Sequence, residues 1–206
     1  MLKSIRPAVA MLVLFTLLTG LAYPLAITAI AQLAFAAAAN GSLVLRDGKP
    51  VGSILIGQYF AGDSYFHSRP SATQAPDPKD PSKTVDAPYN AANSGGSNLA
   101  MTSKTFIDRV KADIDARRAS GWQGAIPADA VTTSGSGLDP HITPANAAGQ
   151  IVRVAKARGL AEERVRALVE AATQTRSFGV LGEPLVNVLA LNLALDRMTA
   201  GGVSAQ

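Results

Sequence analysis

Two turns rich in glycine and serine are the most suggestive local features of this 206-residue sequence. They lie at Ser94–Asn98 and Ser134–Asp139. Successive free backbone N–H groups in turns of this kind can hold a phosphate. However, neither turn contains a lysine, the P-loop pattern is absent, and Asp139 would repel an anion. The composition therefore favours structural turns or a docking surface over a phosphate site.

The only two histidines, His67 and His141, offer little for a metal site or a hydrolase. The chain has no cysteine, and no cluster of His, Asp and Glu has the spacing of a zinc site. His141 could join Asp139 and a serine in a catalytic triad, but the G-x-S-x-G elbow is missing. We therefore expect no self-sufficient active site, no metal and no tightly bound cofactor.

Two further side chains could bind a ligand. Arg69, between His67 and Pro70, could hold a carboxylate with both arms of its guanidinium, or it could pair with an acid of its own domain. Gln150 lies near the start of a predicted helix, where its amide could reach a ligand. A solvent-facing or internal hydrogen bond is the simpler expectation for this amide.

One long uncharged stretch determines where all of these residues lie. From Pro7 to Leu45 there is no Asp, Glu, Lys or Arg. A helix needs roughly 20 apolar residues to cross about 30 Å of hydrocarbon, so we predict a transmembrane helix over residues 8–33. The alternative is a signal peptide cleaved near Ala34–Ala36, but the apolar region of a signal peptide is usually only about 7–15 residues long.

The charges flanking this stretch predict its orientation. Lys3 and Arg6 form the only charge cluster before it, and basic residues stay preferentially on the cytoplasmic side. Residues 1–7 should therefore be cytoplasmic, and a domain over residues 40–206 should lie outside the cell membrane. The net charge of +4 is spread too thinly along the chain to suggest nucleic acid as a partner.

The outer domain is predicted to be of mixed α/β (α+β) class. Its first element should be a buried strand over Gly52–Phe60, from the β-branched and aromatic residues there. Residues 72–88, rich in Pro, Asp and Lys, should form a solvated loop. Helix signals mark Ser103 to Gly121, Thr143 to Arg158, and residues 162–175. Over residues 186–195 leucines alternate with smaller or polar residues, which favours a strand, although a helix also fits.

An ordered series of motifs resembles one protein family. The series runs Gly57–Phe60, Tyr65–Ser71, Tyr89–Asn90, Ser94–Leu99, Ile126–Pro127, Thr133–Ile142, Gln150, Arg153–Gly159, Leu181–Pro184, Val186–Leu189 and Leu191–Leu193. Together these motifs resemble the C subunit of the bacterial Kdp-type high-affinity potassium-transporting ATPase. The resemblance spans nearly the whole chain, including the single N-terminal span.

The resemblance implies an accessory subunit in the bacterial cytoplasmic (inner) membrane. Its partners would be a P-type ATPase catalytic subunit, a channel-like potassium-binding subunit and a small single-span subunit, in a complex that hydrolyses ATP to import potassium. The family's role is described as that of a catalytic chaperone, which raises the ATP affinity of the catalytic subunit. The residues implied in nucleotide contact correspond to Ser134, Gly135, Ser136, Gly137 and Gln150. ATP is cytoplasmic, whereas the charge asymmetry places these residues outside, so support of the potassium entrance is the alternative role.

Further residues are candidates for contact with other subunits. They are Gly20, Tyr65, Phe66, Arg69, Ser94, Gly95, Gly96, Asn98, Asp139, His141 and Asn187. Gly20 and the small residues around it would permit close approach of another membrane helix. A function of a different class also fits the sequence: an anchored outer-face ligand-binding module or hydrolase that uses the Ser134–His141 turn.

Overall fold

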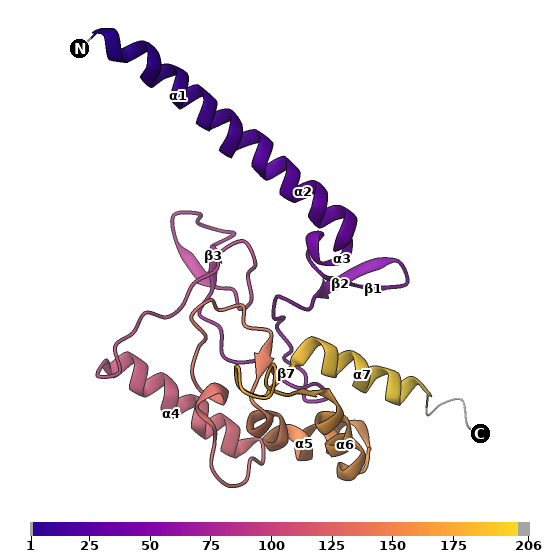
Figure 1. The fold of residues 1–206 in the computed structure, drawn as a ribbon. Helices are drawn as coiled ribbons and strands as arrows, with labels where there is room; N and C mark the ends of the chain where they lie inside the picture. Colours follow the sequence, from indigo (N-terminus) through magenta and orange to yellow (C-terminus); the bar gives the residue numbers. More distant parts are fainter. Residues whose placement is uncertain (1, 202–206) are drawn as a thin grey trace. The chain divides into compact units, whose positions relative to one another are not determined.

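The computed structural model describes residues 2–201 of the chain. These residues divide into two compact units, one within Met1–Ser53 and one within Ile54–Gln206. Each unit has its own arrangement of helices and strands (Figure 1).

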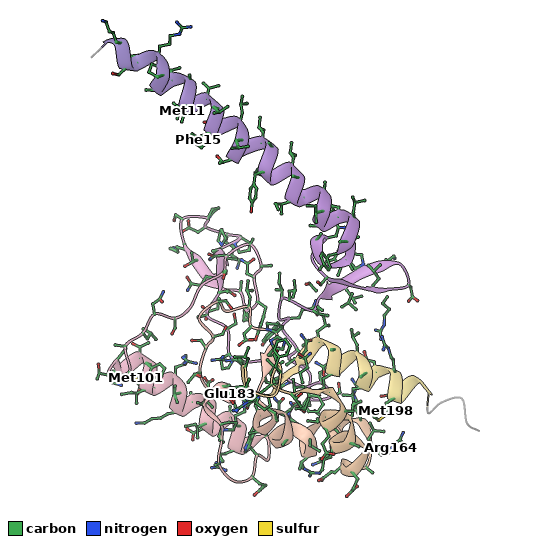
Figure 2. The ribbon with its side chains drawn as sticks, viewed as in Figure 1. Met11, Phe15, Met101, Arg164, Glu183 and Met198 are labelled. Carbon is green, nitrogen blue, oxygen red and sulfur yellow. The ribbon has the colours of Figure 1, made fainter. Side chains whose placement is uncertain are left out.

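The first unit is dominated by one long apolar helix, which runs from Ile5 to Ala34. Its parts, after a short 3-10 turn η1 (Leu2–Ser4), are α1 (Ile5–Leu17), η2 (Leu18–Ala22) and α2 (Tyr23–Ala34). Figure 2 shows Met11 and Phe15 projecting from α1, and both side chains are half-exposed. The helix is long and apolar enough to cross a membrane, as the sequence predicts.

The segment η2 is a π-helical turn in the middle of this helix. The N–H of Tyr23 bonds to the carbonyl of Leu18, five residues earlier, which is the spacing of a π turn. Pro24 follows directly, and it has no N–H to give to Gly20 as a regular α-helix would require. The wider turn therefore lies directly before the proline, which interrupts the regular i to i−4 bonding of the helix.

The first unit ends in a short helix and a hairpin. They are α3 (Ala36–Ala39), β1 (Leu43–Arg46) and β2 (Lys49–Ser53), with the two strands antiparallel. The strand predicted over Gly52–Phe60 is wrong, because β2 stops at Ser53 and the residues after it form no ladder. Their backbone is held instead by single bonds from distant segments: the N–H of Gly57 donates to the carbonyl of Leu138 over 2.8 Å. Ile54 and Leu55 are exposed rather than buried.

The second unit combines helices with small sheets, so the predicted mixed class is confirmed. Its helices are α4 (Lys104–Ala119), η3 (Ala128–Ala130), α5 (Pro144–Arg158), α6 (Glu162–Ala172) and α7 (Val188–Gly201). Its strands are β3 (Gln74–Pro76) paired with β4 (Thr84–Asp86), and a three-stranded antiparallel sheet in the order β5 (His141–Ile142), β7 (Leu185–Asn187), β6 (Thr173–Gln174). Helices α5 and α6 lie side by side (Figure 1).

The main core lies among α5, α6, α7 and β7. Its buried residues are Phe66, Ile142, Ala147, Ile151, Val154, Ala155, Val165, Val169, Val186, Val188, Leu191 and Leu195. A smaller cluster of Trp122, Ala130 and Val131 packs against α4 residues Val110 and Ile114. Trp122 also lies on α5, where a side chain added at Gly149 would overlap its ring.

The predicted ends of α5 are confirmed. The Thr143 hydroxyl accepts the N–H of Asn146 over 3.1 Å, and Pro144 occupies the first helical position. Gly159 ends the helix with a left-handed φ of 63°. The helix predicted from Ser103 is also present as α4, although Ser103 makes no side-chain cap bond.

Three further sequence predictions need correction. Most of residues 72–88 are exposed or half-buried, with Thr73 buried, but they contain the β3–β4 hairpin as well as loop. The third helix stops at Ala172, and residues 173–174 form strand β6. The strand favoured over 186–195 is short, and α7 begins at Val188, because Val188, Leu191, Asn192 and Leu195 are all buried at helical spacing.

Candidate functional site

The two glycine-serine turns lie against each other. The N–H of Gly95 donates to the carbonyl of Ser136 over 2.9 Å, and the Ser94 hydroxyl donates to the same oxygen over 3.0 Å. A Cβ on Gly96 would stand 3.0 Å from the carbonyl oxygen of Gly135. Glycine thus permits the close approach of the two backbones, and the turns bond to each other.

Gly137 closes this junction. Its φ of 66° is left-handed, and a Cβ there would stand 2.5 Å from Thr73 Cγ2 and 2.7 Å from the carbonyl oxygen of Gly95. The Ser71 hydroxyl donates to the carbonyl of Gly137 over 2.8 Å. The turn at Ser134–Asp139 is therefore wedged between the segment around Ser71 and the other turn.

Arg69 pairs with an acid of its own domain. Its Nη1 lies 3.1 Å from Oδ2 of Asp139, and its Nη2 donates to the carbonyl of Thr133 over 3.2 Å. The other carboxylate oxygen of Asp139 accepts the backbone N–H of His141 over 3.0 Å, while it lies 3.7 Å from Nδ1 of the His141 ring. Because Asp139 is engaged by Arg69 and does not hydrogen-bond the imidazole, this turn lacks the geometry of a catalytic triad.

Gln150 is a buried bridge, only 1% exposed. Its Oε1 accepts the backbone N–H of His67 over 2.7 Å and an N–H of Arg153 over 2.8 Å. Its Nε2 donates to the carbonyl of His67 over 3.0 Å and to Oδ1 of Asn146 over 2.8 Å. All four hydrogen-bonding positions of this amide are thus used inside the chain, so direct contact with a ligand would require breaking one of them.

A second buried side-chain amide, that of Asn192, makes the same pair of bonds to the backbone of Phe66, the residue before His67. Its Oδ1 accepts the N–H of Phe66 over 2.9 Å, and its Nδ2 donates to the carbonyl of Phe66 over 3.0 Å. Asn187 similarly donates to the carbonyl of Ile54 over 2.8 Å. Sequence reasoning did not single out Asn192. The signal was an asparagine within an apolar stretch, at a position that helical spacing places in the core.

The side-chain amides of Gln150 and Asn192 therefore make the backbone hydrogen bonds that a neighbouring strand would otherwise provide. Each satisfies both the N–H and the C=O of one residue in the irregular segment around Phe66 and His67. Buried backbone groups without partners are costly, so an irregular segment can cross a core only with such support.

The segment held in this way lines an open groove of about 900 Å³. Four arginines line it, which we call the arginine groove: Arg69, Arg109, Arg117 and Arg153. Arg109 donates to Asp113 over 2.9 Å, yet Nε and Nη2 of Arg109 and Nε of Arg69 have no hydrogen-bond partner in the described structure. Acidic side chains of the groove, Asp63, Asp86 and Asp113, balance part of this positive charge.

The titratable groups of the groove reflect burial next to positive charge. Burial, and then the charge of Arg153, lowers the pKa of His67 from 6.5 to about 4, so this ring is neutral at pH 7. Burial also lowers the pKa of Arg117 and of Arg153. The groove thus places several guanidinium groups in a partly desolvated setting, which suits carboxylates or other anions.

The remaining candidate contact residues are spread over both units. Gly20 lies in the π turn η2, and Asn98 has a left-handed φ of 50° beside the first glycine-serine turn. Phe66 is fully buried, so it contributes to the core rather than to the surface. Tyr65 lies under the guanidinium of Arg158, which is 4.7 Å from its ring centre.

No group of three or more His, Cys, Asp or Glu side chains within residues 2–201 could hold a metal ion.

Comparison with known proteins gives a consistent result. The family model described as KdpC, the c chain of the K⁺-transporting ATPase, matches residues 5–197. A protein from Bradyrhizobium diazoefficiens, named potassium-transporting ATPase KdpC subunit, is 60% identical over 97% of this chain and 100% of its own length. Proteins of the same name from Rhodopseudomonas palustris (strain BisB18) and Methylobacterium nodulans are each 62% identical, over 95% and 96% of this chain and 98% of their own lengths.

Proposed function

This chain belongs to the KdpC family, the c chains of K⁺-transporting ATPases, and from that premise we propose that it is a non-catalytic subunit that stabilises the assembled pump. In this proposal its partners are a P-type ATPase catalytic subunit, a channel-like potassium-binding subunit and a small single-span subunit. The helix over residues 8–33 crosses the bacterial cytoplasmic membrane, residues 1–7 are cytoplasmic, and the second unit lies on the outer face. Potassium is the transported ion of the complex.

The observation that carries this proposal is the arginine groove. Four arginine side chains line this open groove, and those of Arg69 and Arg109 are 23% and 28% exposed beside their own aspartates. An acidic segment of a neighbouring subunit would bind the exposed guanidinium edges through charge-assisted hydrogen bonds. The groove is open, and its lining arginines and aspartates offer charge and hydrogen bonds to a docked segment, which supports a docking role.

The charge of the groove also bears on potassium. In this proposal the groove lies near the potassium entrance, where the guanidinium charge that its own aspartates leave unbalanced would repel the cation at short range. Docked carboxylates would neutralise this charge, so covering the groove and keeping the entrance accessible to potassium are compatible. We therefore propose support of the potassium entrance as the role of the second unit.

A second role within the family is that of a catalytic chaperone that raises ATP affinity. Gln150 uses all its hydrogen-bonding positions internally, and Ser134 is only 6% exposed. We propose that Ser134–Gly137 and Gln150 act on ATP affinity through subunit contacts and not by touching the nucleotide. The proposed outer placement supports the same conclusion, because ATP is cytoplasmic.

Charge reversal in the groove tests the docking role. Arg117→Glu, introduced in the full complex, should lower the recovery of the other subunits through a tag on this chain. Arg166→Glu, on the exposed face of α6, is the matched control and should leave recovery unchanged. Fluorescence of the single tryptophan, Trp122, checks that both variants fold. Full recovery with Arg117→Glu, together with unchanged potassium-dependent ATP hydrolysis, would overturn the proposal.

A further inference from the structure

The hairpin β1–β2 is fixed to the end of the long helix within the first unit. The side-chain amides of Gln32 and Asn40 bond to each other reciprocally, over 3.1 and 3.3 Å. Asn40 also donates to the carbonyl of Ala36 over 2.8 Å, so the residue after α3 is tied back to the helix. The Ser53 hydroxyl donates to the carbonyl of Gly41 over 2.7 Å and closes the base of the hairpin.

The hairpin displays apolar side chains that the described structure does not cover. Leu43 is 56% exposed and Leu45 is 61% exposed, and both lie on one face of β1 because they are two residues apart. Pro50 stands opposite Leu45 in the register, and Val51 lies at the irregularity beside it. A two-stranded hairpin is marginally stable by itself in water, so a surface that covers this face would stabilise it.

The position of the hairpin along the chain limits what that surface can be. Only eight residues separate Ala34, the last residue of α2, from Leu43, and four of them form helix α3. The 30-residue helix is about 45 Å long, close to the full thickness of a bilayer with its headgroup layers, so a hairpin tied to its end comes near the outer headgroup layer. The uncharged surface that starts at Pro7 continues without interruption as far as Leu45.

The first charges after the helix stand at the far end of the hairpin. Arg46 and Lys49 face each other across the strands, with Asp47 in the turn between them. A basic side chain such as that of Lys49, next to an apolar face, is typical of peptides that bind at a membrane surface. The apolar side enters the headgroup–acyl boundary while the cationic side chains reach the phosphates.

We propose that the β1–β2 hairpin lies in the headgroup layer of the bilayer that the long helix crosses. Leu43 and Leu45 face the acyl chains, and Lys49 lies among lipid phosphates. The hairpin then acts as a collar that sets the depth and tilt of the helix, which is a role separate from docking through the arginine groove. The inference depends on the helix spanning the membrane, and the test below separates the two.

Because the sequence has no cysteine, each single-cysteine variant of the full chain in lipid nanodiscs carries one spin label at a known position. The nanodiscs contain a mixture of phosphatidylcholine and phosphatidylglycerol, and one label is placed at a time on Leu43→Cys, Leu45→Cys or Met11→Cys. Val85→Cys, on the exposed strand β4 of the second unit, is the reference for an aqueous site. Power saturation with oxygen and with a water-soluble nickel chelate reports the depth of each label.

Labels at Leu43 and Leu45 should be several-fold more accessible to oxygen, relative to the nickel chelate, than the label at Val85. A nickel accessibility equal to that at Val85 would overturn the inference. Shielding from both reagents would also overturn it, because this result means that protein, such as the chain's own second unit, covers the face. A label at Met11 that is itself water-accessible would refute the spanning helix instead, which distinguishes the two failures.

Discussion

Replacing Asn192 with leucine isolates the contribution of one side-chain amide to the stability of the second unit. The variant removes both bonds to Phe66, at 2.9 and 3.0 Å, in a place where Asn192 is 1% exposed and Phe66 is fully buried. Each buried group left without a partner costs about 1–3 kcal/mol, and burying the apolar leucine offsets roughly 1 kcal/mol of this. We expect the free energy of unfolding to fall by about 2–4 kcal/mol.

The assay is urea unfolding of the full chain in detergent, followed by the fluorescence of Trp122. This ring packs on Gly149 of α5, so it reports on the unit that Asn192 holds together. The control is Asn93→Leu, because Asn93 also donates to a backbone carbonyl, that of Gln74, but in an exposed position. The control should change stability by at most about 0.5 kcal/mol.

A second substitution at the same site gives a result with a definite sign. Asn192→Asp keeps the acceptor for the Phe66 N–H but places a carboxylate against the Phe66 carbonyl, so the pKa of the new carboxyl should be raised by burial. Stability should then be greatest below the unfolded pKa of about 3.9 and should fall as pH rises towards the raised folded value. If Asn192→Leu matches the wild type, or if Asn192→Asp shows no such pH dependence, our account of Asn192 is refuted.

Three further predictions concern two glycines where a side chain would clash and one half-buried histidine. Gly149→Ala should destabilise the second unit by about 1–3 kcal/mol in urea unfolding, because the new methyl overlaps the Trp122 ring, and its fluorescence maximum should shift. Gly137→Ala should lower the melting temperature, because its left-handed φ and the contact with Thr73 at 2.5 Å both disfavour a side chain; a change under about 1 °C would contradict this. His67 has its pKa lowered to about 4, so the folded state resists protonation; stability should be full above pH 6.5 and decline as pH falls towards 4. His67→Gln should flatten this part of the pH profile in calorimetry.

Local signals in the sequence predicted the elements whose ends are set by neighbouring residues. The start of α5 follows from Thr143 and Pro144, and its end follows from Gly159, so no distant part of the chain is needed to place it. The long helix follows from an apolar stretch too long for any other element of a small protein. The resemblance to the C subunit of Kdp-type ATPases is confirmed by the family match over residues 5–197.

Elements that depend on distant partners were the ones mispredicted. The apolar run after Ser53 has the composition of a buried strand, but its hydrogen bonds go to Leu138 and Asn187, which no local pattern reveals. The alternating leucines near the C-terminus favoured a strand, but the burial of Val188, Leu191, Asn192 and Leu195 at helical spacing shows a helix. For Arg69 the sequence left two alternatives, and only the fold brings Asp139 close enough to decide between them.

The side-chain amides that hold Phe66 and His67 also impose an order on the synthesis of the protein. Gln150 lies 83 residues after His67 in the chain, and Asn192 lies 126 residues after Phe66. A ribosome therefore makes the apolar helix first, and the residues around Phe66 emerge long before any of these partners exist. The second unit lacks the hydrogen bonds of Asn192 until helix α7 has left the ribosome. Folding of the second unit should therefore be completed only at the end of synthesis, and a chain truncated within α7 should not fold this unit.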